Sequence, residues 1–368
     1  MNKVIEIMPP EIEEIGENLK ISIIFKLDGK EIPLWYEAPK KFVNMEQLST
    51  AFFNALYIPA INMTGTLKVH GEVSPKLLSN IETIQDMMKN WFPVRFPDSV
   101  EVKARALIPK NSYYKPKVAA FFTAGVDSLN TFLKHKDEID YLVYHHKFID
   151  EKGMKISNKK ETNNIKEFAK KYGKEVIEVK TNISGFVVPH AEWTAQYHGS
   201  AFASAAILLS KDIGKFYLGS SHCYSSLVKY GSHPALDYLF EVEGMRLIHD
   251  GAESTRIDKI RRISQHPEVF KYLNYGCGKE ICSKPEKCIR TMIMLDLFGI
   301  RDKCDHCNKH DYTLEEVRNM YISGESNFSK AVENYRALSK RPDKVELRKA
   351  LKVCMDNYKR KRAWKFTT

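Results

Sequence analysis

Residues 118–129 combine the residue types of a phosphate-binding turn. A short apolar run comes first, then the small residues Ala124 and Gly125, and then Asp127 and Ser128. A tight turn that begins a helix directs backbone N–H groups outward, where the helix dipole also favours an anion. The Ser128 hydroxyl would add a donor. Asp127 or Ser128 could instead simply cap the helix, and these residues alone do not decide between the two interpretations.

Two histidines and two serines further along the chain lie among glycine, serine and proline. His198 and His233 have such flanks, which indicate backbone close to a ligand, although either could be an ordinary histidine. Ser220 and Ser221 follow a strand-like apolar run. Ligands bind beyond the carboxyl ends of parallel strands, so this position favours a binding role.

Three carboxylates and one arginine are further candidates. Asp237, Asp250 and Glu253 could bind magnesium or a substrate amine, or could pair with Arg256. Arg256 could offset the negative charge of a phosphate or an acyl-adenylate.

Five of the seven cysteines lie close together, and they are Cys277, Cys282, Cys288, Cys304 and Cys307. Because the N-terminus does not have the features of a secretory signal, this clustering indicates a metal site before disulfides. Four thiolates would satisfy a tetrahedral structural zinc. The alternative is a set of reduced thiols without metal. Cys223 and Cys354 have no cysteine nearby in the sequence, and we expect them to be structural.

These candidates lie in a stretch where strand-like and helix-like segments alternate. The alternation is typical of an α/β fold with a parallel sheet covered on both faces. The expected strands are residues 118–122, 141–144, 176–179 and 216–219, and the expected helices begin near residue 128 and cover 165–172 and 198–210.

The regions on either side differ in character. Residues 1–108 are expected to form a separate α+β domain, with a hairpin turning at Asp28-Gly29, helices at 45–56 and 75–91, and strands at 66–69 and 100–106. Residues 308–368 are expected to be helical and basic, with 15 lysines and arginines against 8 acidic residues. The run Lys359 to Arg362 could bind nucleic-acid phosphates or could be a solvated helix end.

The overall composition limits the class of protein that the sequence can encode. The 368 residues are 43% hydrophobic and 28% charged, with a formal net charge of +11, which is typical of a globular protein of two or three domains. No apolar run approaches the roughly 20 residues of a membrane span. We therefore expect a cytoplasmic protein that does not enter a membrane.

The turn at Thr123 to Ser128 resembles the Ser-Gly-Gly-x-Asp-Ser signature of the PP-loop family, the N-type ATP pyrophosphatases. Thr123 replaces the first serine and keeps its hydroxyl, and Ala124 replaces the first glycine. The resemblance implies a Rossmann-like (HUP) domain over residues 117–307. It also implies that ATP lies against Thr123, Ala124, Gly125, Val126 and Ser128, and that Asp127 helps to place Mg²⁺.

Downstream segments are similar to a PP-loop subgroup that resembles 7-cyano-7-deazaguanine synthase. The segments are His198-Gly199-Ser200-Ala201, Gly219-Ser220-Ser221, Gly231-Ser232-His233-Pro234-Ala235-Leu236-Asp237, His249-Asp250-Gly251-Ala252-Glu253-Ser254-Thr255-Arg256 and Lys287-Cys288-Ile289-Arg290-Thr291-Met292. Deazaguanine synthases carry a four-cysteine zinc site. Related proteins often show Cys-x2-Cys-x2-Cys before arginine, and here Pro285 occupies the middle position.

The resemblance implies an AMP-forming ligase. It would adenylate a carboxylate on a deazapurine or a peptide, with Asp127, Ser128 and Arg256 catalytic and His198, His233, Asp237 and Asp250 near the substrate. Some of the subgroup lie in bacterial antiviral gene clusters, where protein partners are expected. Two alternatives remain: RNA modification with Cys223 as the reactive thiol, and a nucleotide-binding partner without turnover.

Overall fold

The computed structural model describes residues 4–63, 65–108, 115–146, 159–274, 286–304 and 311–365. The fold is α/β, with a large, mostly parallel sheet and many helices. Contacts divide the chain into two compact units. The first unit comprises residues 1–122, 135–218 and 229–250, and the second comprises residues 123–134, 219–228 and 251–368.

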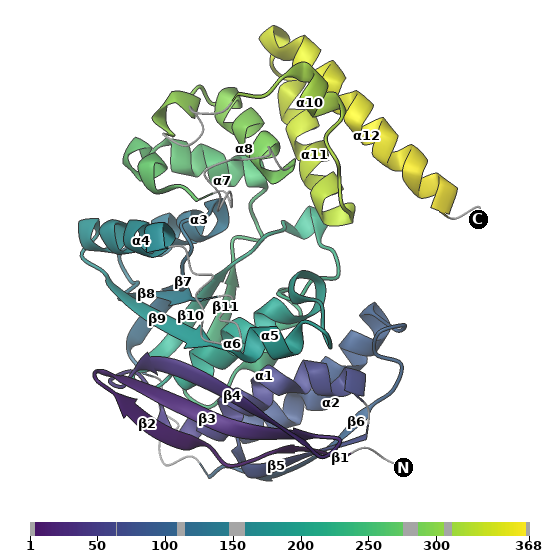
Figure 1. The fold of residues 1–368 in the computed structure, drawn as a ribbon. Helices are drawn as coiled ribbons and strands as arrows, with labels where there is room; N and C mark the ends of the chain where they lie inside the picture. The colour runs from purple at the N-terminus through teal and green to yellow at the C-terminus, as the bar shows by residue number, and fades with distance from the viewer. Residues whose placement is uncertain are drawn as a thin grey trace. The chain divides into compact units, whose positions relative to one another are not determined.

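The sheet contains a block of five neighbouring strands (Figure 1), and the middle three of these have apolar, mostly buried sequences. The strands are β7 (Lys117–Phe121), β8 (Tyr141–His145), β9 (Glu175–Thr181), β10 (Ile213–Gly219) and β11 (Arg246–Asp250). Their order is β9-β8-β7-β10-β11. β7 pairs in parallel with both β8 and β10, so two strands that are far apart in the sequence flank it.

The N-terminal strands continue the same sheet. They are β1 (Val4–Ile7), β2 (Glu11–Ile15), β3 (Asn18–Leu27), β4 (Lys30–Pro39), β5 (Gly65–Val73) and β6 (Val100–Ala106). Asp28 and Gly29 have φ of 51° and 77°, as a two-residue hairpin turn with two positive φ angles requires. β4 pairs antiparallel with β9, at Tyr36 and Thr181. Residues 1–108 therefore share a sheet with part of the expected PP-loop range, and the compact units do not follow the expected boundary.

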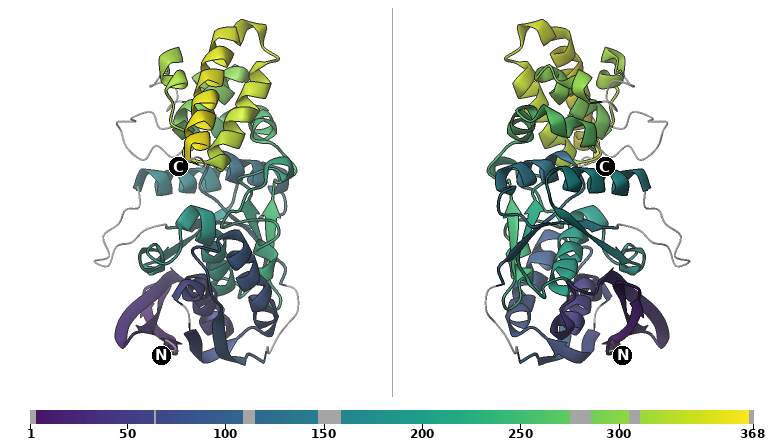
Figure 2. Two further views of the ribbon diagram at one scale, coloured as in Figure 1. Left: turned by 90° about the vertical axis from the view of Figure 1, so that its right-hand side faces the viewer. Right: turned by 90° about the vertical axis from the view of Figure 1, so that its left-hand side faces the viewer.

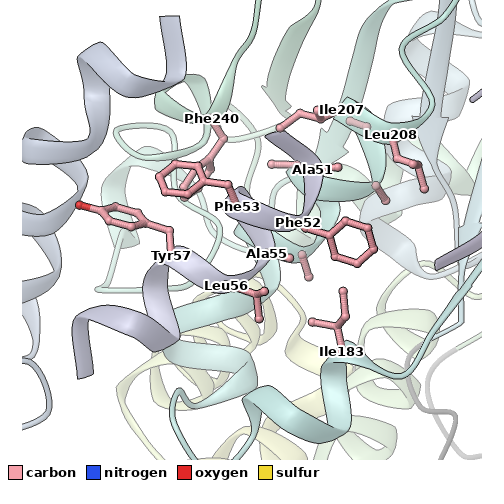
Figure 3. Packing of buried hydrophobic residues seen from close by; sticks show 14 of the residues in the cluster. Ala51, Phe52, Phe53, Ala55, Leu56, Tyr57, Ile183, Ile207, Leu208 and Phe240 are labelled. Atoms are coloured by element: carbon pink, nitrogen blue, oxygen red, sulfur yellow. The ribbon is translucent and has the colours of Figure 1, made fainter. Parts of the chain in front are cut away.

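The core of the first unit lies around two apolar helices, α1 (Leu48–Met63) and α6 (His198–Leu208) (Figure 3). Hydrogen bonds join them, from the Asn54 side chain to the Ser200 carbonyl (2.9 Å) and from the Ser204 hydroxyl to the Ala51 carbonyl (2.6 Å). Small residues on α6 leave room for the aromatic side chains of α1. The other α-helices of this unit are α2 (Pro75–Trp91), α4 (Lys159–Lys171) and α5 (Ile183–Val187).

The second unit is helical. The α-helices among its described residues are α3 (Val126–His135), α7 (Arg256–Ser264), α8 (Glu286–Leu297), α10 (Leu314–Arg318), α11 (Glu325–Leu338) and α12 (Val345–Lys365). α11 packs against α7, α8 and α12, and both views of Figure 2 show α12 alongside α11. The expected boundary at residue 307 therefore does not separate the C-terminal helices from α7 and α8. Within the described ranges, each helix is too short or too polar to cross a membrane.

Candidate functional site

The turn after β7 is held by its own hydrogen bonds. The Ser128 hydroxyl accepts from the Thr123 amide (3.3 Å) and donates to the Gly125 carbonyl (3.1 Å). Ala124 has φ of +53°, a conformation that L-residues other than glycine rarely adopt. The turn thus keeps the left-handed backbone at the position where the family signature has glycine, and the alanine bears the strain.

The segment after β10 lies against this turn. A Cβ added to Gly219 would be 3.0 Å from the Asp127 carbonyl oxygen, so a side chain at this position would crowd the turn. The Ser220 hydroxyl donates to the His222 carbonyl (2.6 Å), which occupies it within its own loop. Ser221 is half-buried. The two expected phosphate-side segments are therefore brought together.

Two cations bind the Asp127 carboxylate. The Arg256 guanidinium lies 2.6 Å from Oδ2, and the Lys259 amine lies 3.2 Å from Oδ1. Lys259 is almost fully buried and also donates to the Ser220 carbonyl. Burial raises the pKa of Asp127, but the positive charges of Arg256, Lys259 and Lys330 outweigh it, so the pKa falls well below its ordinary value. Asp127 is therefore ionised over the whole physiological range.

Helix α11 completes this charged cluster with Lys330 and Glu333. Burial, together with the charges of Arg256 and Arg290, lowers the pKa of Lys330 to about 7. The Glu333 carboxylate accepts from the Arg256 backbone amide (2.9 Å), and burial raises its pKa. A lysine that titrates near neutrality beside two fixed cations would gain its proton when an anion binds.

A second cluster forms within the first unit around buried Asp237. Its carboxylate accepts from the Ser232 hydroxyl (2.7 Å) and contacts His249 Nδ1 (2.8 Å), and the His233 backbone amide donates to Oδ1 (3.2 Å). A carboxylate on Nδ1 fixes the orientation of the imidazole ring. His233 Nδ1 accepts from the Ala235 amide (3.0 Å), and burial lowers the pKa of this histidine.

His198 lies at the start of α6, next to the glycine loop of this cluster. Its Nδ1 is 3.2 Å from the Trp193 carbonyl oxygen. A Cβ on Gly231 would be 2.8 Å from the same nitrogen, and one on Gly199 would be 2.2 Å from the Gly231 carbonyl oxygen. The expected substrate residues His198, His233 and Asp237 thus belong to one cluster.

Asp250 and Glu253 have other contacts. Asp250 follows His249 on β11, so its side chain points to the opposite face of the sheet. It pairs with His135 Nε2 (2.9 Å). Glu253 pairs with Lys134 (2.6 Å) on an exposed surface. Arg256 binds Asp127, and the structure records no pair between it and Asp237, Asp250 or Glu253 among the described residues.

The expected zinc site lies largely outside the described residues. Cys277, Cys282 and Cys307 fall in ranges that the structure does not describe. Cys288, on α8, and Cys304 are both buried. Among residues that are described, no group of three or more histidine, cysteine or acidic side chains could hold a metal ion. Zinc therefore remains an expectation.

Sequence reasoning missed several members of the charged cluster. Lys259 lies three residues after Arg256, and this helical spacing puts both side chains on the same face of the helix. The spacing could therefore have identified Lys259 from the sequence. Lys330 and Glu333 come from the C-terminal region, where only a basic composition stood out. His249 lies in one of the segments that resemble the PP-loop subgroup, and the sequence indicated no role for it.

Comparisons of the chain with family models, with curated proteins and with solved structures each found no match. The geometry of these clusters and the resemblance of the turn to the PP-loop signature are therefore what indicates a function.

Proposed function

We propose that the protein is an ATP-dependent, AMP-forming ligase whose phosphate site is the charged cluster of the second unit. The observation that carries the proposal is the convergence of Arg256, Lys259 and Lys330 on Asp127, in the first turn of the helix that follows β7. Arg256 and Lys259 supply two positive charges beside the Asp127 carboxylate, and Lys330 adds a third when it is protonated, an arrangement that suits a polyphosphate.

The strand order supports this proposal. Counted from β7, the order β9-β8-β7-β10-β11 is 3-2-1-4-5, as in doubly wound, Rossmann-like nucleotide-binding sheets. In such sheets, ligands bind beyond the carboxyl ends of the strands where the order reverses, which here means β7 and β10. The turn at 123–128 and the segment at 219–223 directly follow these two strands.

The proposed reaction starts when an oxygen of the substrate carboxylate attacks the α-phosphorus of ATP. The bond from that phosphorus to its bridging oxygen breaks, and pyrophosphate leaves with the electron pair. An amine then attacks the acyl carbon, loses a proton and displaces AMP. The cations stabilise the charge that gathers on the departing pyrophosphate. Protonated Lys330 would add to this once the phosphates are bound.

Asp127 fits a role in holding Mg²⁺, because it stays ionised and is partly exposed. Bound Mg²⁺ would neutralise phosphate charge. Both carboxylate oxygens now contact cations, so Arg256 or Lys259 would transfer to the phosphates when the carboxylate takes the metal. This exchange keeps every charge in the cluster paired.

Release of pyrophosphate and AMP from magnesium-ATP tests the proposal. The wild type is compared with Asp127→Ala and with Glu346→Ala, which removes an exposed, ion-paired carboxylate on α12. The reactions contain 7-carboxy-7-deazaguanine with ammonia or, separately, a cell extract. We expect substrate-dependent release that is lost only in Asp127→Ala. ATP binding without release from any substrate would instead support the non-catalytic partner.

One observation favours RNA modification as a second candidate. The buried thiol of Cys223 contacts the hydroxyls of Ser225 and Ser226 and lies 3.9 Å from Glu333 Oε1, beside the charged cluster. Lys359, Arg360 and Lys361 are exposed on α12 and could contact phosphates. If this function is correct, the protein retains RNA, and the retention falls steeply as salt rises. It also releases AMP only when RNA is present, and Cys223→Ser allows adenylation but blocks the release of AMP that follows.

A further inference from the structure

The second unit contains a cavity of about 700 Å³ that none of the expected site residues lines. Its walls come from the loop 225–228, the first turn of α7, the end of α8 and one face of α11. This volume is in the range of small-molecule sites, which are mostly apolar with a few placed polar groups.

Along helix α11 and the residues that follow it, the wall of the cavity changes from apolar to basic. The lining residues recur at helical spacing along one face, so they form a continuous stripe. Phe328 and Val332 supply an apolar middle, which Phe298, the residue directly after α8, extends. Arg336 and Lys340 supply a basic end.

The two cations at the basic end of the cavity are available to bind an anionic ligand. Arg336 and Lys340 are exposed, and neither forms an ion pair with a carboxylate that the structure describes. Two other lining cations differ in this respect, because Arg261 pairs with Asp258 and Arg341 pairs with Asp343. An anion that contacts Arg336 and Lys340 would therefore not have to displace an existing partner.

The cavity also adjoins the proposed phosphate site. Glu333 lines the cavity, and its carboxylate accepts from the backbone amide of Arg256, whose guanidinium binds Asp127. Thr255, the capping residue directly before Arg256, lines the cavity as well. Glu333 therefore belongs both to the lining of the cavity and to the charged cluster.

We propose that this cavity binds the acceptor substrate, and that the substrate is a small anion with an aromatic or otherwise apolar body. The body packs on Phe298, Phe328 and Val332, and an anionic group contacts Arg336 and Lys340. The role of the ligand as acceptor substrate rests on the proposed function. The prediction that the ligand is an anion with an apolar body rests on the residues that line the cavity.

Matched probes test the ligand class. 2-Naphthoate and neutral 2-naphthamide have the same body and differ in charge, and calorimetric titration gives the affinity of each. We expect the wild type to bind naphthoate at least tenfold more tightly. The charge reversal Arg336→Glu with Lys340→Glu removes that preference, whereas Lys349→Glu with Lys352→Glu makes the same charge change on exposed α12 and preserves it. Equal affinities, or a preference that survives the reversal, overturn the proposal.

Two single variants separate this proposal from the proposed function. Val332→Trp fills the cavity, so we expect both probes to bind at least tenfold more weakly while magnesium-ATP binding is retained. Asp127→Ala removes the proposed chemistry, and we expect naphthoate to bind it as it binds the wild type. Naphthoate binding that Val332→Trp does not weaken overturns the cavity assignment. Substrate-dependent pyrophosphate release that Val332→Trp retains overturns the acceptor role.

Discussion

Replacing Lys330 with methionine should stabilise the folded protein, and the gain should be larger at pH 6 than at pH 9. Burial and two neighbouring arginines lower the pKa of Lys330 from 10.5 to about 7. The unfolded chain restores the ordinary pKa. Between these two values the unfolded state binds more protons than the folded state, so stability rises with pH across that window. Below it, both states are protonated and the destabilisation is complete.

The size of the effect follows from the pKa difference. At 1.36 kcal/mol per pKa unit, the charged amine costs on the order of 4–5 kcal/mol at pH 6 and about 2 kcal/mol at pH 9. The gain in free energy of unfolding for Lys330→Met should therefore be ~2–3 kcal/mol larger at pH 6. Under the proposed function, the same variant should also lose pyrophosphate release, because residues that serve a function often lower the stability of the fold.

Urea unfolding at the two pH values, followed by circular dichroism, measures this difference. Lys352→Met is the matched control, since Lys352 is exposed on α12 and its replacement should change stability little at either pH. An equal gain at both pH values, or a loss of stability at pH 6, would show that the charge of Lys330 is not destabilising in the folded protein.

Four further substitutions, at three positions, test other parts of the structure. Ala124→Gly should change the free energy of unfolding by less than about 1 kcal/mol, because relief of left-handed strain and added unfolded-state entropy oppose each other. Ala124→Val should lower it by about 1–3 kcal/mol, and urea titration that ranks valine level with glycine would contradict the strained turn. Lys259→Met removes a buried partner of Asp127 and should cost about 1.5–3 kcal/mol, less when Asp127 is already asparagine; a double-mutant cycle with no coupling would dismiss the ion pair. Gly199→Ala places a Cβ 2.2 Å from the Gly231 carbonyl oxygen and should lower the melting temperature by several degrees, whereas an unchanged temperature would mean that the loop moves freely.

Local patterns predicted many of the elements. The Asp28-Gly29 turn and the strand at 100–106 are confirmed, because turn chemistry and alternation are encoded within a few residues. The helix at 75–91 is confirmed, and the structure adds that Ser74 caps it. The short strand β11 was missed, since its five residues carry two charges and only two are fully buried.

The pairing of strands that are far apart in the chain could not be predicted from the sequence. Tyr36 and Thr181 pair across 145 positions, and nothing local to either residue indicates its partner. The same limit applies to Lys330, whose role depends on α11 packing against α7 and α8. The turn at 123–128 could be singled out because the order of its residues resembles a known signature, although the residue types alone also fit a helix cap.

The pairing of β4 with β9 has a consequence for any shortened chain. A chain that begins at residue 117 would leave β9 as an open edge strand, with backbone donors and acceptors ready to pair with another molecule. It would also uncover α6, whose buried Ser200 and Ser204 now donate to carbonyl groups of α1. Such a fragment should aggregate. The N-terminal strands and α1 therefore cover surfaces of β9 and α6 through which the parallel strands could otherwise associate with another molecule.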